Sequence, residues 1–421
     1  MYQNVSINLL NLILSMSDAM DLASSELSQH QLRTAFIAWE LGKAAPLPPA
    51  AIDDVFIASL LHDIGALSLE DKIEVHRGES INTERHCIVG ERVLETLPLF
   101  GGPAKIVRFH HTPWHALSDR AGKPYALLSQ IVQLADVLER AIDRQTYILH
   151  QHRGLASTIS SLSGTVLSAE VVEIFESVSA REDFWLDLAS PRLYSLLMRN
   201  GPSRSIEIDL ALLTQISKLF RDIIDFRSRF TATHSSGVAT SAGEISRLLG
   251  LTETESGMME VAGNLHDLGK LAIPNSILNK PGPLDAKEAA LMRQHTYFTY
   301  TVLNSIGGIP QIAEWAAFHH ERLDGSGYPF HIGEQKLSIG ARIMAVADLF
   351  TALAEDRPYR GGMDQKRVLS IMRDMRDRKF IDAIVFRVLE ENYGEIHGLT
   401  QQKQAEAQQH YEEDFTLSEA R

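Results

Sequence analysis

The chain has 421 residues, enough for two ordinary domains that each bury a core of their own. An apolar fraction of 44% and a charged fraction of 22% are typical of a globular protein. The net charge of -14 argues against a general nucleic-acid binder, although a local positive pocket could still take a small anion.

The first segments of the chain argue against a signal peptide or a membrane span. No Lys or Arg precedes Arg33, so no basic region stands ahead of an apolar one. The apolar run from Ile7 to Leu14 is interrupted by Asn8 and is far shorter than the roughly 20 residues that a span needs. The only cysteine is Cys87, which agrees with a reducing compartment. We therefore expect a cytoplasmic protein.

Histidines and aspartates recur in the same order in both halves of the chain. HDIG at 62–65 matches HDLG at 266–269 at an offset of 204 (266 − 62), and later matches fall at 209 (295 − 86) and 212 (348 − 136). The paired residues are His30, His62, Asp63, His86, His110, His111 and Asp136 in the first copy, and His234, His266, Asp267, His295, His319, His320 and Asp348 in the second. Two copies of one domain are the simplest account.

Apolar residues follow helical spacing along most of the chain, as at Ile216, Leu219, Phe220 and Ile223, and sustained alternation is scarce. We predict an all-α fold with two tandem helical bundles, each carrying one HD dipeptide. The turn-forming cluster at 200–203 places the boundary, so the domains are expected at residues 1–200 and 205–421.

The recurring set favours metal binding, at least in the second copy. Imidazole and carboxylate together suit Fe, Mn or Zn, and an aspartate such as Asp267 is able to bridge two ions. A lone buried histidine is more often a hydrogen-bonded core residue, but recurrence of the whole set makes that reading weaker here.

Two further features of the second copy suggest a phosphate-binding site. Lys270 follows His266 by four residues, so we expect both on one face of a helix, with the ammonium near a substrate phosphate. The run DGSGYP at 324–329 predicts a tight loop in which glycines let the backbone approach a ligand and Tyr328 presents its ring. A surface lysine and a plain surface turn are the alternatives.

With HDLGKLAIP, HHERLDGSGYP and VADLFTALAEDRPYR, residues 205 to 400 resemble the HD-GYP family of cyclic dinucleotide phosphodiesterases, in the HD hydrolase superfamily. The resemblance implies two divalent metals, iron or manganese rather than zinc, on the seven His and Asp residues of the second copy. It also implies hydrolysis of cyclic di-GMP or cyclic GMP-AMP to a linear 5′-phosphorylated dinucleotide. Asp267 and Lys270 would be catalytic. The candidate substrate contacts are Lys270, Arg322, Asp324, Gly325, Gly327, Tyr328, Arg357 and Arg360. For Arg357 and Arg360, ordinary pairing at the surface is an equal alternative.

Some members of this family hold a third metal through a glutamate four residues before the first histidine. That position is Phe230 in the second copy, so two metals are expected there. Glu26 holds the same position in the first copy, where a solvated helix carboxylate is the simpler reading.

The first copy keeps the whole candidate ligand set but has Ala66 at the lysine position, and no GYP follows its HH pair. Two interpretations stay open. It is either a regulatory or dimerising HD domain that still holds metal, or a second hydrolytic site that removes the 5′-phosphate from the linear product.

Two other functions of the second copy are compatible with the same residues. The second copy could be a non-catalytic cyclic dinucleotide receptor that signals through the first, or it could hydrolyse a nucleoside polyphosphate. The amphipathic segment 210–224 could pair two chains in a homodimer, and the resemblance suggests contact with a diguanylate cyclase-type protein.

Overall fold

The computed structural model describes residues 6–22, 24, 27–77, 83–120, 122–202, 206–226, 233–355 and 361–413. The chain divides into two compact units. The N-terminal unit is Asn8–Ile206, and the C-terminal unit is Glu207–Arg421 together with the chain's first residues up to Ile7. Among the described helices, none has the length and apolarity that crossing a membrane requires.

The N-terminal unit is built from helices joined by short turns. They are α1 (Leu9–Asp21), α2 (His30–Ala44), α3 (Pro49–Leu60), α4 (Leu69–Arg77), α5 (Thr83–Glu95), η1 (Pro98–Phe100), α6 (Gly101–Phe109), α7 (Trp114–Leu117), η2 (Ser118–Arg120), α8 (Pro124–Ala141), α9 (Ile148–Ser160), α10 (Ala169–Ser179), α11 (Glu182–Leu188) and α12 (Leu193–Asn200).

The C-terminal unit is also helical. Its helices are α13 (Leu210–Asp225), α14 (His234–Leu248), α15 (Glu253–Leu265), η3 (Leu268–Ala272), α16 (Asn275–Leu278), α17 (Ala286–Ile306), α18 (Pro310–Ala317), α19 (Ile339–Ala354), α20 (Gln365–Asp377), α21 (Ala383–Glu391) and α22 (Tyr393–Tyr411). Two short strands, β1 (Ile7–Asn8) and β2 (Glu207–Ile208), pair in a two-stranded sheet. The prediction of an all-α fold is confirmed.

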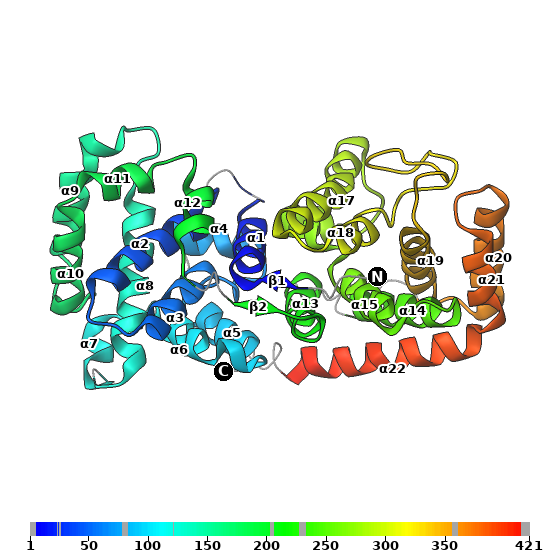
Figure 1. Cartoon of the computed structure of the whole chain (residues 1–421), viewed down its shortest axis with the longest axis horizontal. Helices are drawn as coiled ribbons and strands as arrows, with labels where there is room; N and C mark the ends of the chain where they lie inside the picture. The colour runs from blue at the N-terminus through cyan, green and yellow to red at the C-terminus, as the bar shows by residue number, and fades with distance from the viewer. Residues whose placement is uncertain are drawn as a thin grey trace. The chain divides into compact units, whose positions relative to one another are not determined.

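The two units share one packing scheme. In the C-terminal unit α14 packs against α15 and α19, and α18 packs against α15, α17 and α19. In the N-terminal unit α2 packs against α3 and α8, and α6 packs against α3, α5 and α8. Helix α22 is an addition to the C-terminal unit and runs along α14 (Figure 1). The elements that carry the recurring residues therefore have the same neighbours in both units.

A buried aspartate precedes the first histidine of each set. Asp225 ends α13, and its carboxylate accepts hydrogen bonds from the Ser235 backbone N–H (3.0 Å) and the Ser235 hydroxyl (2.7 Å) at the start of α14. Asp21 ends α1 and accepts from the Gln31 backbone N–H at 3.0 Å, at the start of α2. A side-chain oxygen at a helix N-terminus satisfies a backbone N–H group that has no partner within the helix. These contacts fix the starts of α14 and α2, which are the positions of His234 and His30.

The glycine of each HD motif permits a close backbone approach. A Cβ atom on Gly269 would lie 1.9 Å from the carbonyl oxygen of His295, and one on Gly65 would lie 2.0 Å from that of His86. No side chain fits at such distances, so glycine is required for the HD turn to lie against the helix that carries the next histidine.

Candidate metal centres

The C-terminal unit brings its seven predicted ligands together from five places in the bundle. They stand at the start of α14 (His234), after α15 (His266 and Asp267), within α17 (His295), after α18 (His319 and His320) and within α19 (Asp348). The Nε2 atoms of His295 and His319 are 3.3 Å apart, and His234 Nε2 is 3.1 Å from Asp348 Oδ1. The side chains therefore converge on one point.

Backbone carbonyls fix the orientation of three of these imidazoles. The Nδ1 atoms of His266, His295 and His319 each donate to the carbonyl three residues earlier, at 2.7, 2.7 and 2.6 Å. Because a carbonyl only accepts, Nδ1 carries the proton and Nε2 keeps its lone pair. This is the tautomer that a metal ligand needs.

His234 is held by a carboxylate instead. Both Glu355 oxygens lie 3.2 Å from its Nδ1, and Nε2 points toward Asp348. Burial alone would lower the pKa of His234, but Glu355 and Asp348 raise it to about 10. Glu355 was not predicted, because its counterpart in the other unit stands at a different spacing from the paired aspartate.

Asp267 lies between two groups of histidines. Its Oδ2 is 3.2 Å from His266 Nε2, and its Oδ1 is 3.5 Å from His295 Nε2. His234, His266 and Asp348 form one group able to hold a cation, and His295, His319 and His320 form another. The carboxylate between the groups is placed where a bridging ligand would stand.

The electrostatics keep the acids charged and most of the imidazoles neutral. Burial by itself would raise the pKa of Asp267, but the neighbouring His266 and Lys270 lower it well below the usual range. Burial lowers the pKa of His295 to about 3, and burial with the neighbouring His320 lowers that of His319. Ionised carboxylates and neutral imidazoles are the forms that ligate metals.

The donor set fits divalent metals. The Nε2 atom of His266 is buried and makes no hydrogen bond to any described residue, and the same holds for Asp63 Oδ1 and His111 Nε2 in the N-terminal unit. An orphaned buried polar atom is costly unless something satisfies it. A cation between these atoms would remove that cost in both units.

Lys270 contacts the site by a route that differs from our expectation. Helix α15 ends at Leu265, and Lys270 stands in the 3₁₀ helix η3, so it does not share a helix face with His266. Its ammonium instead donates to Asp267 Oδ2 at 2.5 Å. Burial would lower the pKa of Lys270, but Asp267 raises it, so the cation stays charged beside the candidate ligand.

The loop at 324–329 lies against His320. The ring of Tyr328 is 4.9 Å from the ring of His320, and Gly325 has a φ of +79°, in the region that favours glycine. A Cβ on Gly327 would lie 2.4 Å from the Cα of Glu321. Glu321 is itself buried and accepts backbone hydrogen bonds from Phe330 (2.7 Å) and Ile332 (3.0 Å). This carboxylate, which the motifs did not indicate, anchors the loop.

Two predicted substrate contacts are engaged within the protein. The guanidinium of Arg322 lies over the Phe380 ring at 4.1 Å, and Asp324 accepts a hydrogen bond from the Ser326 backbone at 2.9 Å. The predictions for Glu26, Phe230, Arg357 and Arg360 lie outside the described residues.

The N-terminal unit repeats the arrangement. Asp63 again lies between two groups, with Oδ2 3.3 Å from His62 Nε2 and Oδ1 3.6 Å from His86 Nε2. One candidate group contains His30, His62 and Asp63, and the other contains Asp63, His86, His110 and His111. Asp136 completes the set at 3.6 Å from His30.

Different partners complete the N-terminal set. Glu139 holds His30 Nδ1 at 2.5 Å and takes the part that Glu355 has in the other unit. Arg140 Nη2 lies 2.8 Å from Asp136 Oδ2. Neither residue was predicted, because a charged pair in an amphipathic helix is usually a solvated face.

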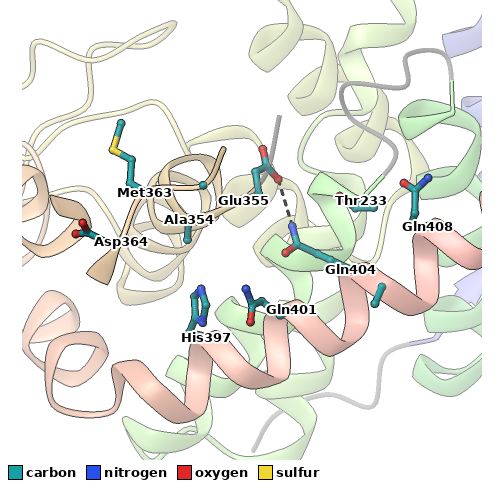
Figure 2. A pocket seen from close by; sticks show the side chains of 11 residues that line it. Thr233, Ala354, Glu355, Met363, Asp364, His397, Gln401, Gln404 and Gln408 are labelled. Carbon is teal, nitrogen blue, oxygen red and sulfur yellow. Dashed lines mark hydrogen bonds between the residues drawn. The ribbon is translucent and has the colours of Figure 1, made fainter. Parts of the chain in front are cut away.

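A polar pocket of about 520 Å³ lies behind His234. Figure 2 shows Gln404 of α22 directed at Glu355, to which its amide donates at 3.3 Å, with Gln401, Gln408 and His397 on the same helix. Glu355 faces the Nδ1 atom of His234, whereas the candidate metal side is Nε2. The pocket is therefore separated from the candidate metal centre by the His234 ring and Glu355.

Comparison with known proteins gives the same division. The HD domain family matches residues 218–385 and, separately, residues 27–141. The chain is 29% identical over 407 residues to 3'3'-cGAMP-specific phosphodiesterase 1 of Vibrio cholerae, covering 94% of each chain. It is 38% identical over 176 residues to the cyclic di-GMP phosphodiesterase response regulator RpfG of Xanthomonas campestris, covering 40% of this chain and 46% of that protein.

A solved structure is similar as well. The crystal structure of a cyclic GMP-AMP specific phosphodiesterase of V. cholerae (V-cGAP3) matches with a TM-score of 0.65 and 25% identity, covering 92% of this chain and 98% of that chain. The chain therefore belongs to the HD domain family, with two HD domains in tandem, and the HDLGK and GYP motifs of the second lie at one candidate metal centre.

Proposed function

We propose that the C-terminal unit hydrolyses a 3′–5′ cyclic dinucleotide to a linear 5′-phosphorylated dinucleotide. The observation that carries this proposal is the position of Asp267 between the His266 and His295 groups, at 3.2 and 3.5 Å. A carboxylate so placed suits two ions about 3.5–4 Å apart, the arrangement used for phosphoryl transfer.

Two divalent ions would be held by the seven ligands of the C-terminal unit. The set consists of imidazole and carboxylate without thiolate, which supports iron or manganese over softer metals. Bound ions of this kind lower the pKa of water and stabilise charge on a phosphate. Phe230 supports a count of two, because it offers no ligand atom where a third ion would need one.

The chain's own groups would position the phosphodiester. The Lys270 ammonium donates to Asp267 Oδ2 at 2.5 Å and would attract a phosphate oxygen as a positive charge beside the centre. Tyr328, whose ring lies 4.9 Å from that of His320, borders the same centre. In the reaction the water oxygen bonds to phosphorus, the bond from phosphorus to the 3′ oxygen breaks, and that oxygen takes up a proton.

The relatives direct the choice of substrate. Those that match nearly the whole chain are named 3'3'-cGAMP-specific phosphodiesterases, whereas those named cyclic di-GMP phosphodiesterases match 40% of it or less. Cyclic GMP-AMP is therefore the first substrate to test and cyclic di-GMP the second.

The test is to incubate the full chain, reconstituted with Mn²⁺ or Fe²⁺, with each cyclic dinucleotide and to separate the products by chromatography. The linear 5′-phosphorylated dinucleotide should form. Tight binding of the cyclic dinucleotide without any conversion would replace this proposal with the receptor function.

The N-terminal unit supports a second candidate function, removal of the 5′-phosphate from the linear product. Its candidate ligand set is complete, with Asp63 between His62 and His86 in the same way as Asp267. The alternative is a regulatory domain that still holds metal. Inorganic phosphate released from the linear dinucleotide should disappear in Asp63→Ala, and equal release in that variant would leave the regulatory role.

A further inference from the structure

We propose that Arg140 is the phosphate-binding cation of the N-terminal site and takes the place that Lys270 has in the C-terminal unit. This proposal rests on the second candidate function above. The two copies differ reciprocally at two aligned positions. Lys270 aligns with Ala66, and Arg140 aligns with Ala352 at the offset that pairs Asp136 with Asp348. The first copy thus has alanine at the first position and arginine at the second, whereas the second copy has lysine at the first and alanine at the second.

The structure places both cations against a candidate ligand carboxylate. Lys270 reaches Asp267 at 2.5 Å, and Arg140 Nη2 reaches Asp136 Oδ2 at 2.8 Å. The same Asp136 oxygen is 4.0 Å from His111 Nδ1, and Asp136 Oδ1 is 3.6 Å from His30 Nε2. Asp136 therefore links Arg140 to both groups of the N-terminal centre. Arg140 comes from α8, whereas Lys270 follows the HD turn.

Arg140 has donors to spare for a ligand. Besides the contact with Asp136, its Nη1 reaches the Val75 carbonyl only at 3.5 Å, and its Nε is buried without a hydrogen bond to any described residue. A guanidinium carries five N–H donors in a planar fork that fits two phosphate oxygens at once. A phosphate beside the centre would satisfy the donors that the protein leaves unused.

A cavity opens next to this arginine. It has a volume of about 590 Å³ and its lining includes His76, Arg77, Arg140 and Arg144, with no carboxylate among the described residues that line it. The ring of His76 is 4.8 Å from that of His30, and Arg140 in the cavity lining contacts Asp136, another candidate ligand of the same centre. Arg144 is fixed by Glu139 and by the Ser28 carbonyl, each at 2.8 Å. A lining with three arginines and no carboxylate among its described residues suits an anion.

These features identify the ligand as a phosphomonoester with room for the group that bears it, such as the 5′-phosphorylated end of a nucleotide. In its hydrolysis the water oxygen bonds to phosphorus, the bond to the 5′ oxygen breaks, and that oxygen takes up a proton. Arg140 would hold the phosphate oxygens as their charge grows, a role in which charge-assisted hydrogen bonds are strong.

The competing explanation is that Arg140 only neutralises Asp136 and keeps it in position. The two roles differ in what Arg140→Ala does to metal content, so the test measures phosphate release, ring opening and metal per chain on the Mn²⁺-reconstituted full chain. Arg140→Lys keeps the charge, and the exposed Arg153 supplies the control variant Arg153→Ala. Phosphate release is followed with the linear 5′-phosphorylated dinucleotide, and ring opening with the cyclic one.

Arg140→Ala should lower kcat/KM for phosphate release by roughly 10- to 100-fold, the range for a lost charged hydrogen bond. Ring opening and metal content should match the Arg153→Ala control, and Arg140→Lys should recover part of the loss. Adding Ala66→Lys to Arg140→Ala, which rebuilds the cation at the Lys270 position, should also recover part of it. Calorimetry with inorganic phosphate on Lys270→Ala chains should show weaker binding when Arg140→Ala is added.

Three results would overturn the proposal. These are phosphate release in Arg140→Ala within twofold of the control, loss of metal in parallel with loss of release, or no phosphate release by the unmodified chain. Ring opening is measured on a different substrate, so failure of the cyclic dinucleotide proposal would be recognised separately.

Discussion

Glu355 holds His234 through two equal contacts, with each carboxylate oxygen 3.2 Å from Nδ1 of the imidazole. A carboxylate in this position fixes the ring and raises the basicity of the opposite nitrogen, which faces Asp348. The C-terminal centre therefore depends on a residue that the HD and GYP motifs do not include.

Replacement of this carboxylate should weaken metal binding without unfolding the protein. We expect Glu355→Gln to reduce the affinity of the C-terminal site for Mn²⁺ by roughly 10- to 100-fold, the usual effect of losing such a partner. Metal titration of the metal-free protein checks this. Glu139→Gln is the matched variant in the N-terminal unit and should leave ring opening unchanged; unchanged affinity in Glu355→Gln would show that Glu355 does not support the ligand.

The lysine of HDLGK should act on turnover rather than on metal retention. Lys270→Ala removes a charge that lies 2.5 Å from Asp267 but no candidate ligand. We expect kcat for ring opening to fall by roughly 10²-fold, as when one donor to a developing charge is lost. Metal content measured on the same samples should be unchanged, and a variant with full activity would remove Lys270 from the catalytic group.

The close approach of Gly269 to the backbone of His295 predicts that one added methyl group strongly destabilises the protein. Gly269→Ala would place Cβ 1.9 Å from the His295 carbonyl oxygen, so α17 or the turn must shift. We expect a loss of about 3 kcal/mol in the free energy of unfolding, at the upper end for overpacked sites. Gly398→Ala in α22 meets nothing within 4 Å and should instead gain up to about 1 kcal/mol. Urea unfolding of the two variants compares them, and equal midpoints would contradict the prediction.

Asp225 should make the metal-free protein less stable as the pH rises. Burial raises its pKa to about 7 in the folded state, whereas an aspartate in an unfolded chain titrates near about 4. The folded state holds this proton more tightly, so the contribution of this group to stability is fully present below about pH 4 and is lost as the pH approaches 7. The Asn side chain of Asp225→Asn cannot ionise, so the stability of this variant relative to the unmodified protein should increase between about pH 4 and pH 7.

Thermal unfolding at several pH values between 4 and 8 tests this difference. Asp21, whose pKa burial also raises to about 7, should give the same trend when it is changed to Asn. Parallel curves for the unmodified chain and Asp225→Asn would show that the carboxyl does not carry its proton in the folded state.

The candidate ligands were predictable from the sequence because each is a chemically rare residue at a fixed place in a repeated helix. The supporting carboxylates were not. Glu139 follows Asp136 by three residues, whereas Glu355 follows Asp348 by seven, so no single offset aligns them. Glu139 reaches His30 from the last turn of α8, whereas Glu355 reaches the equivalent His234 from the end of α19.

Lys270 shows a second limit. The four-residue spacing from His266 predicted a shared helix face, but α15 ends at Leu265 and Lys270 stands in the 3₁₀ helix η3, where Gly269 lies close against His295. The lysine then reaches Asp267 rather than lying beside His266. The position of Lys270 thus depends on tertiary packing, which residue spacing alone does not reveal.

The most direct measurement is the conversion of 3′3′-cyclic GMP-AMP and cyclic di-GMP by the metal-reconstituted full chain, compared with Asp267→Ala. The unmodified chain should form a linear 5′-phosphorylated dinucleotide from at least one of them, and Asp267→Ala should form none above background. Equal rates for the two proteins, or no conversion by either, would contradict the proposal that Asp267 joins two metal ions into a hydrolytic centre.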